Sequence, residues 1–159
     1  MVKRVVLERL DHHNFYDVVK LSQTLTTEQQ KCVAPNDYSI AEASMYPGIS
    51  WPRAIYAEGK PVGFMMLELD NPEDRKAGEL PSHYLWRFMI GGEYQGRGYG
   101  KEVLDLIVEK CKKDGVKELK TSVELGGASP YEFYRAYGFR DTGVKLDCGE
   151  LVLSLSLDN

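Results

Sequence analysis

Apolar and polar positions along the chain follow patterns that predict strands separated by helices. Residues 53–69 (RAIYAEGKPVGFMMLEL) hold two strand-like runs around Glu58-Gly59-Lys60, which predicts a β-hairpin. Residues 83–90 (HYLWRFMI) are apolar on both faces, which predicts a central, buried strand. Further strands are expected at residues 118–125, 139–146 and 150–157, with an edge strand at residues 2–7.

Helical spacing fills the intervals between these strands. Residues 129–137 (SPYEFYRAY) predict a helix with Ser129 as its N-cap and Gly138 just past its end. A longer helix ends at Gly115, and its apolar face holds Val103, Leu104, Ile107, Val108 and Cys111.

Two short helices are expected nearer the N-terminus. Asp11 can cap the first, and the Ser39–Glu42 pattern (SIAE) predicts a capping box that begins the second. The apolar face of the first would hold Phe15, Val18, Val19 and Leu25. The chain therefore predicts a mixed α and β fold, with residues 1–159 as one domain.

Composition narrows the class of protein. The formal net charge of -4 argues against general nucleic-acid binding. The three cysteines form no Cys-x-x-Cys pair, so neither a zinc site nor a disulfide framework is expected, and a reducing cytoplasm is the simplest location. No segment approaches the ~20 apolar residues that a membrane span needs, so no membrane association is expected.

A glycine-rich stretch, residues 93–104 (EYQGRGYGKEVL), joins the predicted central strand to the long helix. Free backbone N–H groups and the helix dipole make such a junction an anion site, and Arg97 and Lys101 add positive charge. A dinucleotide fingerprint would need glycine at 101, and a nucleoside-triphosphatase loop would need Ser or Thr at 102, so both are excluded. A tight turn without a ligand remains the alternative.

Two motifs, one in the glycine-rich stretch and one further along the chain, resemble the GNAT superfamily of N-acetyltransferases, in which two such motifs occur in the same order. Residues 95–100 (QGRGYG) resemble its Gln/Arg-x-x-Gly-x-Gly/Ala signature, and residues 133–139 (FYRAYGF) resemble its second signature. Within the superfamily, the chain is similar over nearly its whole length to bacterial diamine and spermine/spermidine acetyltransferases. The segments that carry this resemblance are residues 28–43 (EQQKCVAPNDYSIAEA), 63–70 (GFMMLELD), 84–104 (YLWRFMIGGEYQGRGYGKEVL) and 121–143 (TSVELGGASPYEFYRAYGFRDTG). The resemblance implies the GNAT fold: an α/β (mixed α+β) protein whose central, twisted, mostly antiparallel sheet splays around acetyl-CoA, with about four flanking helices.

The resemblance also implies direct transfer of an acetyl group from acetyl-CoA to a primary amine in a ternary complex, without a metal. Tyr134 matches the family tyrosine that protonates the sulfur of the departing coenzyme A. The alternative role for Tyr134 is packing in the core beside Phe133. The pyrophosphate would bind the loop, and the pantetheine arm would lie along the central strand. The residues expected to bind acetyl-CoA are Met89, Ile90, Gln95, Gly96, Arg97, Gly98, Tyr99, Gly100, Lys101 and Ser129.

Two positions depart from the family pattern. Eleven residues before Gln95, where many relatives place a glutamate as general base, this chain has Tyr84, and residues 80–92 contain no carboxylate. A water chain, the neighbouring His83, or a carboxylate from another segment would have to serve, although a partly exposed loop histidine without a function is the simpler interpretation of His83. The other departure is Gly127, where the family often has an asparagine that holds the pantetheine.

The expected acceptor is a small di- or polyamine such as spermidine or spermine. Carboxylates would hold its ammonium groups and aromatic faces its methylene stem. The segments expected to wall the acceptor site supply Glu28, Asp37, Glu42, Glu68, Asp70, Tyr46, Trp51 and Trp86. The first choices among these are Glu28, Glu42 and Trp86. Each residue could instead be a solvated or core residue. An aminoglycoside, an amino acid or a protein N-terminus are alternative acceptors, and a non-catalytic acyl-CoA-binding module is the alternative class. A homodimer is compatible with the resemblance.

Overall fold

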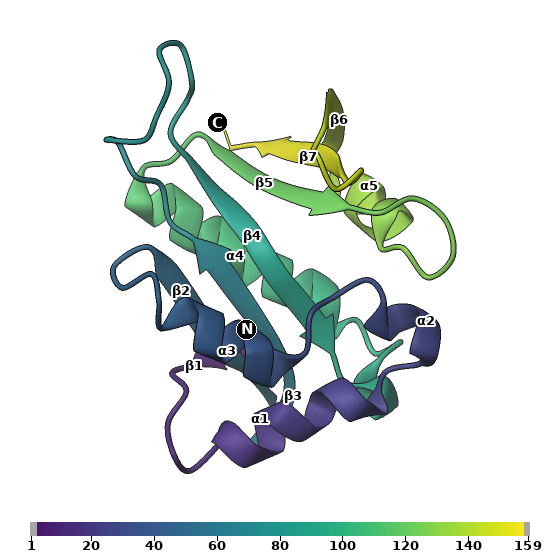
Figure 1. Ribbon diagram of the computed structural model, residues 1–159. Helices are drawn as coiled ribbons and strands as arrows, with labels where there is room; N and C mark the ends of the chain where they lie inside the picture. The colour runs from purple at the N-terminus through teal and green to yellow at the C-terminus, as the bar shows by residue number, and fades with distance from the viewer. Residues whose placement is uncertain (1–2, 158–159) are drawn as a thin grey trace.

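The computed structural model describes residues 3–157, which form a seven-stranded sheet in the order β1-β2-β3-β4-β5-β7-β6 (Figure 1). Neighbouring strands are antiparallel except β4 and β5, which are parallel. The sequence pattern predicted the mixed α and β fold, and the resemblance to the GNAT superfamily implied the mostly antiparallel sheet. The strands are β1 (Val5–Glu8), β2 (Ser50–Ala57), β3 (Lys60–Glu68), β4 (Ser82–Ile90), β5 (Glu118–Val123), β6 (Arg140–Lys145) and β7 (Leu151–Ser156).

Helices cover both faces of the sheet. In Figure 1, α1 and α3 lie in front of β2–β4, and the long α4 crosses behind the sheet. Within the described residues there are five α-helices, close to the four expected: α1 (Phe15–Leu21), α2 (Thr27–Gln30), α3 (Asn36–Ala43), α4 (Tyr99–Asp114) and α5 (Tyr131–Tyr137). Two short 3₁₀ turns, η1 (Ser22–Thr24) and η2 (Gly92–Tyr94), follow α1 and β4.

The core consists of two apolar layers, one on each face of the sheet. Successive side chains of a strand point to opposite faces. On β3, Phe64 and Met66 therefore pack toward α1 and α3, whereas Met65 and Leu67 pack toward α4. The hairpin that contains β3 was predicted, and its two-residue turn, Glu58-Gly59, has positive φ at both positions, as a type I′ turn requires.

The predicted central strand, β4, is central but only half-buried. It is the fourth of seven strands, yet most of its side chains are partly exposed, and β3 is the more deeply buried strand instead. The reason is that residues 84–90 line two cavities. Apolar residues on both faces of a strand can thus reflect ligand-facing surface as well as core.

Both helix caps predicted near the N-terminus are wrong. Asp11 stabilises the turn before α1, where its Oδ1 accepts hydrogen bonds from the backbone N–H groups of His13 and Asn14, and the helix begins only at Phe15. Ser39 lies inside α3 and is buried, because that helix begins at Asn36. The capping box is instead at Thr26, where it begins α2. Leu25, which was expected on the apolar face of the first helix, lies after the η1 turn and so is not part of α1.

The C-terminal half follows the sequence pattern closely. Gly115 ends α4 in the left-handed conformation, as predicted. The hydroxyl of Ser129 accepts a hydrogen bond from the backbone N–H of Tyr131, so it supports the start of α5, although the residue at the N-cap position is Pro130. The predicted edge strand is β1, at one end of the sheet; Val2 lies outside the described residues.

Candidate functional site

The sheet opens between its two parallel strands. β4 and β5 pair only from Ser82 to Leu85 on β4, and the rest of β4 has no β5 partner. At the last paired position, the Thr121 hydroxyl donates a hydrogen bond of 3.0 Å to the Leu85 carbonyl. Beyond it the strands diverge and leave an open edge of β4, which fits the splayed sheet expected from the sequence.

The glycine-rich stretch found in the sequence connects this open strand to the N-terminus of α4. Its residues between β4 and α4, 91–98, are here called the glycine loop. Gly98, at the N-cap, has a φ of 84°, a conformation that side chains other than glycine rarely adopt. Among residues 3–157 no side chain caps the helix, so its first N–H groups have no side-chain acceptor there. The one carboxylate in the first turn, Glu102, is paired with Arg4, whose Nη2 also donates 3.0 Å to the Arg97 carbonyl.

A cavity of about 550 Å³, here called the loop cavity, lies against this junction. A Cβ on Gly100 would lie 3.1 Å from Cζ of Phe133, so glycine allows this ring to lie close to the first turn of α4. Open N–H groups beside apolar walls suit a ligand with a phosphate and a long, mostly apolar arm. The lining residues are Phe88, Met89, Ile90, Tyr94, Gln95, Gly96, Gly98, Tyr99, Gly100, Lys101, Pro130, Phe133 and Tyr134.

Two of the ten residues expected to bind acetyl-CoA lie outside the lining of this cavity. Arg97 turns back to the loop, where its Nη2 donates 3.1 Å to the Glu93 carbonyl. Ser129 is at the start of α5. Gln95 lines the cavity and also fixes the loop, since its Nε2 donates 2.9 Å to the Ile90 carbonyl.

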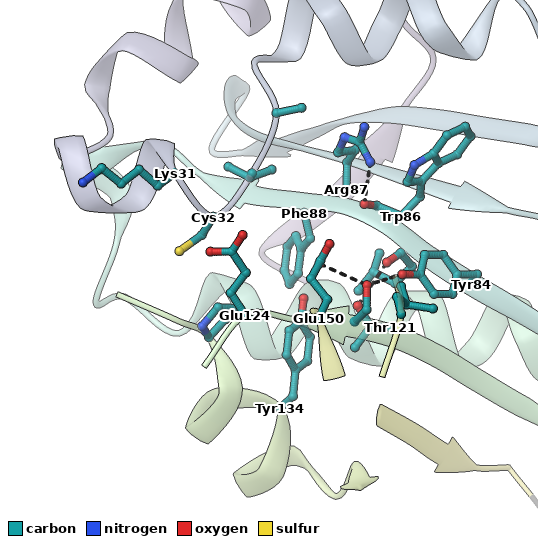
Figure 2. Close-up of a pocket in the computed structure, with 16 residues that line it drawn as sticks. Lys31, Cys32, Tyr84, Trp86, Arg87, Phe88, Thr121, Glu124, Tyr134 and Glu150 are labelled. Atoms are coloured by element: carbon teal, nitrogen blue, oxygen red, sulfur yellow. Dashed lines mark hydrogen bonds between the residues drawn. The ribbon is translucent and has the colours of Figure 1, made fainter. Parts of the chain in front are cut away.

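A second cavity of about 400 Å³, here called the carboxylate cavity, lies in the opening between β4 and β5 (Figure 2). Figure 2 shows Glu124 and Glu150 directed into it from the β5 side, with Trp86 and Arg87 of β4 opposite. The complete lining is Lys31, Cys32, Val33, Ala34, Tyr84, Leu85, Trp86, Arg87, Phe88, Thr121, Ser122, Glu124, Pro130, Tyr134, Leu146 and Glu150.

The two cavities meet at three shared residues: Phe88, Pro130 and Tyr134. Tyr134 is 5% exposed. Burial raises the pKa of its phenol well above the usual value, an effect that the nearby Thr121 hydroxyl partly offsets. The phenol therefore stays protonated at neutral pH, so it can donate a proton at the junction of the cavities.

Of the three residues expected to bind the acceptor, Trp86 lines the carboxylate cavity. Glu42 is engaged with Arg87, whose Nη2 lies 2.8 Å from its Oε1. Glu28 forms an exposed ion pair with Lys31 at the cavity rim, and its Oε2 would lie 3.9 Å from a Cβ on Gly127.

Sequence reasoning missed Glu124 and Glu150. A signal for Glu124 exists: it directly follows β5, and ligands of parallel strands bind at their carboxyl ends. Glu150 precedes β7 in a polar turn, and only the return of β7 alongside β5 brings it to the cavity.

Five more of the residues expected to wall the acceptor site are absent from the lining of the carboxylate cavity: Asp37, Tyr46, Trp51, Glu68 and Asp70. Trp51 packs on the α4 side of the sheet, where the Lys110 ammonium lies 4.5 Å from its ring centroid. Asp70 pairs with Arg75, 2.6 Å away, in the loop before β4.

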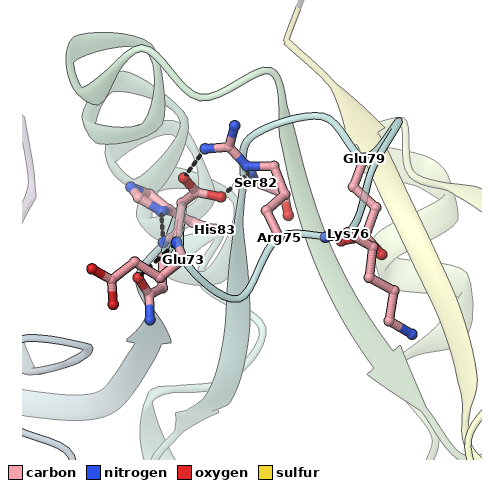
Figure 3. A network of polar contacts seen from close by, with 8 residues as sticks. Glu73, Arg75, Lys76, Glu79, Ser82 and His83 are labelled. Carbon is pink, nitrogen blue, oxygen red and sulfur yellow. Dashed lines mark hydrogen bonds and ion pairs between the residues drawn. The ribbon is translucent and has the colours of Figure 1, made fainter.

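His83, a possible base, is buried at 4% exposure rather than partly exposed (Figure 3). Its Nδ1 accepts from the Asp70 N–H, and its Nε2 lies 2.9 Å from Asp114 Oδ2. His83 therefore has a structural role, and the prediction that placed it in a loop is wrong.

Two features are absent from residues 3–157, namely a metal-binding cluster and a membrane-spanning helix. No group of three or more His, Cys, Asp or Glu side chains in this range could hold a metal ion. No helix described here has the length and apolar content needed to cross a membrane.

Comparison with known proteins agrees with the fold and the motifs. Residues 15–139 match the acetyltransferase (GNAT) family. The chain is 32% identical over 110 residues to the spermine/spermidine N(1)-acetyltransferase of Bacillus subtilis (strain 168), a match that covers 64% of this chain and 67% of that protein.

Solved structures share the fold at low sequence identity. An acetyltransferase from Thermus thermophilus superposes with a TM-score of 0.71 at 19% identity, covering 96% of each chain. The PaiA N-acetyltransferase from Thermoplasma acidophilum, solved in complex with coenzyme A, gives 0.68 at 15% identity, covering 96% of this chain and 98% of that one. Since the family match spans most of the sequence, the protein belongs to the GNAT family and is an N-acetyltransferase.

Proposed function

We propose that this protein transfers the acetyl group of acetyl-CoA to a primary amine of a small di- or polyamine. The observation that carries the proposal is the meeting of two cavities at Tyr134, in the opening of the sheet. The loop cavity would take acetyl-CoA and the carboxylate cavity the amine. A relative that is 32% identical and named for spermine and spermidine supports this acceptor class.

The acetyl-CoA side rests on backbone groups. The first N–H groups of α4 and the loop from Gln95 to Gly100 would hold the pyrophosphate, with Lys101 nearby. The pantetheine arm would lie along Met89 and Ile90, on the open edge of β4. Arg97 and Ser129 would then act by holding the loop and the start of α5 rather than by contact.

The acceptor side rests on charge and aromatic surface. Lys31 is paired with Glu28 and Arg87 with Glu42, so the basic groups at the carboxylate cavity already have partners. Glu124 has no ion-pair partner within the described residues and is available to a distal ammonium group. Trp86 offers an aromatic face for the methylene stem.

Tyr134 would supply the proton that the departing thiolate needs. Bound acetyl-CoA supplies the reactive thioester, and the neutral amine attacks its carbonyl carbon. As the carbon–sulfur bond breaks, the protonated Tyr134 phenol at the junction would donate to sulfur, which avoids expulsion of a free thiolate.

A panel of amines with release of free thiol as the readout tests the proposal. We expect spermidine and spermine to be acetylated with higher kcat/KM than a monoamine of similar length. Preference for an aminoglycoside, an amino acid or a peptide N-terminus would contradict the acceptor class only. Tight binding of acetyl-CoA by calorimetry without turnover on any amine would favour an acyl-CoA-binding module instead.

A further inference from the structure

Acetyl transfer to an amine needs a group that accepts a proton from nitrogen. A nitrogen that attacks a carbonyl carbon acquires positive charge and must lose a proton before the amide is stable. The central strand offers no carboxylate, since residues 80–92 contain none, and His83 is buried in a separate network. The candidates that remain are a water chain and a carboxylate from another element.

A chain of hydrogen bonds crosses the carboxylate cavity from β4 to the turn before β7 (Figure 2). The Tyr84 hydroxyl on β4 is hydrogen-bonded to the Ser122 hydroxyl on β5. The Ser122 hydroxyl in turn donates 3.2 Å to Oε1 of Glu150. Because Ser122 donates its single proton to Glu150, Tyr84 must be the donor to Ser122. The chain thus has one direction, toward the carboxylate.

We propose that Glu150 is the proton acceptor of the reaction, reached through Tyr84 and Ser122. This inference rests on the proposed function of the carboxylate cavity. It uses a carboxylate from a turn far along the chain in place of the strand glutamate of many relatives. All three residues line the same cavity as Tyr134, so the donor and the acceptor of protons face the same space.

The proton balance of the step closes. The nitrogen–carbon bond forms, the carbon–sulfur bond breaks, and sulfur takes the Tyr134 proton. The nitrogen proton passes to the Tyr84 oxygen, the Tyr84 proton to Ser122, and the Ser122 proton to Glu150. Tyr84 and Ser122 end as they began. Glu150 then releases its proton to solvent, and Tyr134 takes one up.

The surroundings of Glu150 support its role as proton acceptor, because in the part of the chain that the structure describes they contain no cation bound to its carboxylate. Its second oxygen, Oε2, accepts from the Cys148 thiol at 3.2 Å, and no Lys or Arg pairs with it within the described residues. The other titratable or charged groups that face the cavity are Tyr84, Tyr134, Glu124, Cys32, Lys31 and Arg87. Glu150 is therefore not held in an ion pair among residues 3–157.

The test compares Glu150→Gln with wild type on spermidine and on a simple monoamine. We expect kcat to fall about 10²–10³-fold on both amines, within the range for a positioned base, with the KM for acetyl-CoA unchanged. The deficit should shrink as pH rises, because hydroxide takes over the proton transfer. Asp147→Asn, an exposed position in the same turn that is absent from the cavity lining, is the matched control and should keep wild-type kcat.

A second variant breaks the same chain at another point. Ser122→Ala should lower kcat as well, and the double variant Ser122→Ala/Glu150→Gln should be no slower than Glu150→Gln alone. Wild-type kcat in either single variant, or additive losses in the double variant, would overturn the proposal. A rise confined to the polyamine KM would also overturn it, because Glu150 would then be an ammonium ligand. Absence of turnover in the wild type would instead remove the proposed function, and this inference with it.

Discussion

The Thr121 hydroxyl donates a hydrogen bond of 3.0 Å to the Leu85 carbonyl at the point where β4 and β5 part. Both residues are buried, with 2% exposure each. This side chain takes the place of a backbone partner at the apex of the opening. It therefore stabilises the sheet at the position from which both cavities open.

Replacing Thr121 with Val removes this hydrogen bond at nearly constant volume. A buried carbonyl without its donor costs about 1–3 kcal/mol, so we expect the melting temperature to fall by roughly 3–9 °C. Thr142→Val is a matched control. Thr142 lies on the exposed strand β6, and its hydroxyl donates a similar hydrogen bond to the Val152 carbonyl on β7. Calorimetry should show a clearly smaller loss for the control, and equal losses would contradict this account.

Binding of acetyl-CoA should depend on Gly98. Gly98→Val puts a branched side chain at a φ of 84° and in front of the α4 N-terminus. We expect affinity for acetyl-CoA to fall by about tenfold or more, as judged by calorimetry. Gly78→Val is the control, because Gly78 has a φ of 86° in a loop away from the loop cavity. If both variants bind acetyl-CoA as wild type does, the loop does not hold the pyrophosphate.

Tyr134→Phe keeps the ring and removes the proton donor. We expect kcat to fall about 10²–10⁴-fold with little change in affinity for acetyl-CoA. Burial raises the pKa of Tyr134, so its phenol should remain protonated as pH rises. The wild-type kcat should therefore show no loss that depends on Tyr134 between pH 7 and about 10. Wild-type turnover in the variant, measured with chemistry rate-limiting, would disprove the assignment.

Glu124→Gln should separate polyamines from monoamines. Only a polyamine has a second ammonium group to lose a partner, so its KM should rise about tenfold while that of a monoamine stays nearly constant. Glu132→Gln, an exposed position on α5 outside the cavity lining, is the control. Equal changes in KM for both amines would show that Glu124 does not bind the second ammonium group.

Stability should fall in acid through Asp114. Burial raises the pKa of this carboxyl, but hydrogen bonds from His83 and Lys110 more than offset the effect and hold its pKa below the usual value. A carboxyl with a lowered folded pKa stabilises the protein above its unfolded pKa, near ~3.9, and loses that contribution as pH falls. Asp114→Asn should therefore lower the melting temperature at pH 7 and differ less from wild type near pH 3. A constant difference across this range would contradict the prediction.

Local patterns predicted the elements that carry the site. The two signatures around Gln95 and Tyr134 combine backbone geometry with specific side chains, and both are contiguous in the sequence. The strand order was not readable, because pairing of β5 with β7 depends on contacts between distant segments. Helix starts near the N-terminus were wrong where Asp and Ser have uses other than capping, as Asp11 does in its turn.

The side chains that line the carboxylate cavity were the hardest to predict. Glu42 suits an ammonium group by type, but tertiary structure gives it Arg87 as a partner. Glu150 has no motif around it and reaches the cavity only after β7 has paired. Charge and type suggest which residues can bind an amine, whereas the fold decides which carboxylates are left without a cation.

The open edge of β4 has a consequence for amide hydrogen exchange. Central strands are usually among the most protected parts of a protein. From Trp86 to Ile90, however, β4 has a partner strand on one side only, so amides that point into the opening have no interstrand acceptor. These amides should exchange quickly in the free protein beside slowly exchanging neighbours, and should slow when acetyl-CoA lies along the open edge of β4. A central strand of this enzyme would then report occupancy of its own site, residue by residue.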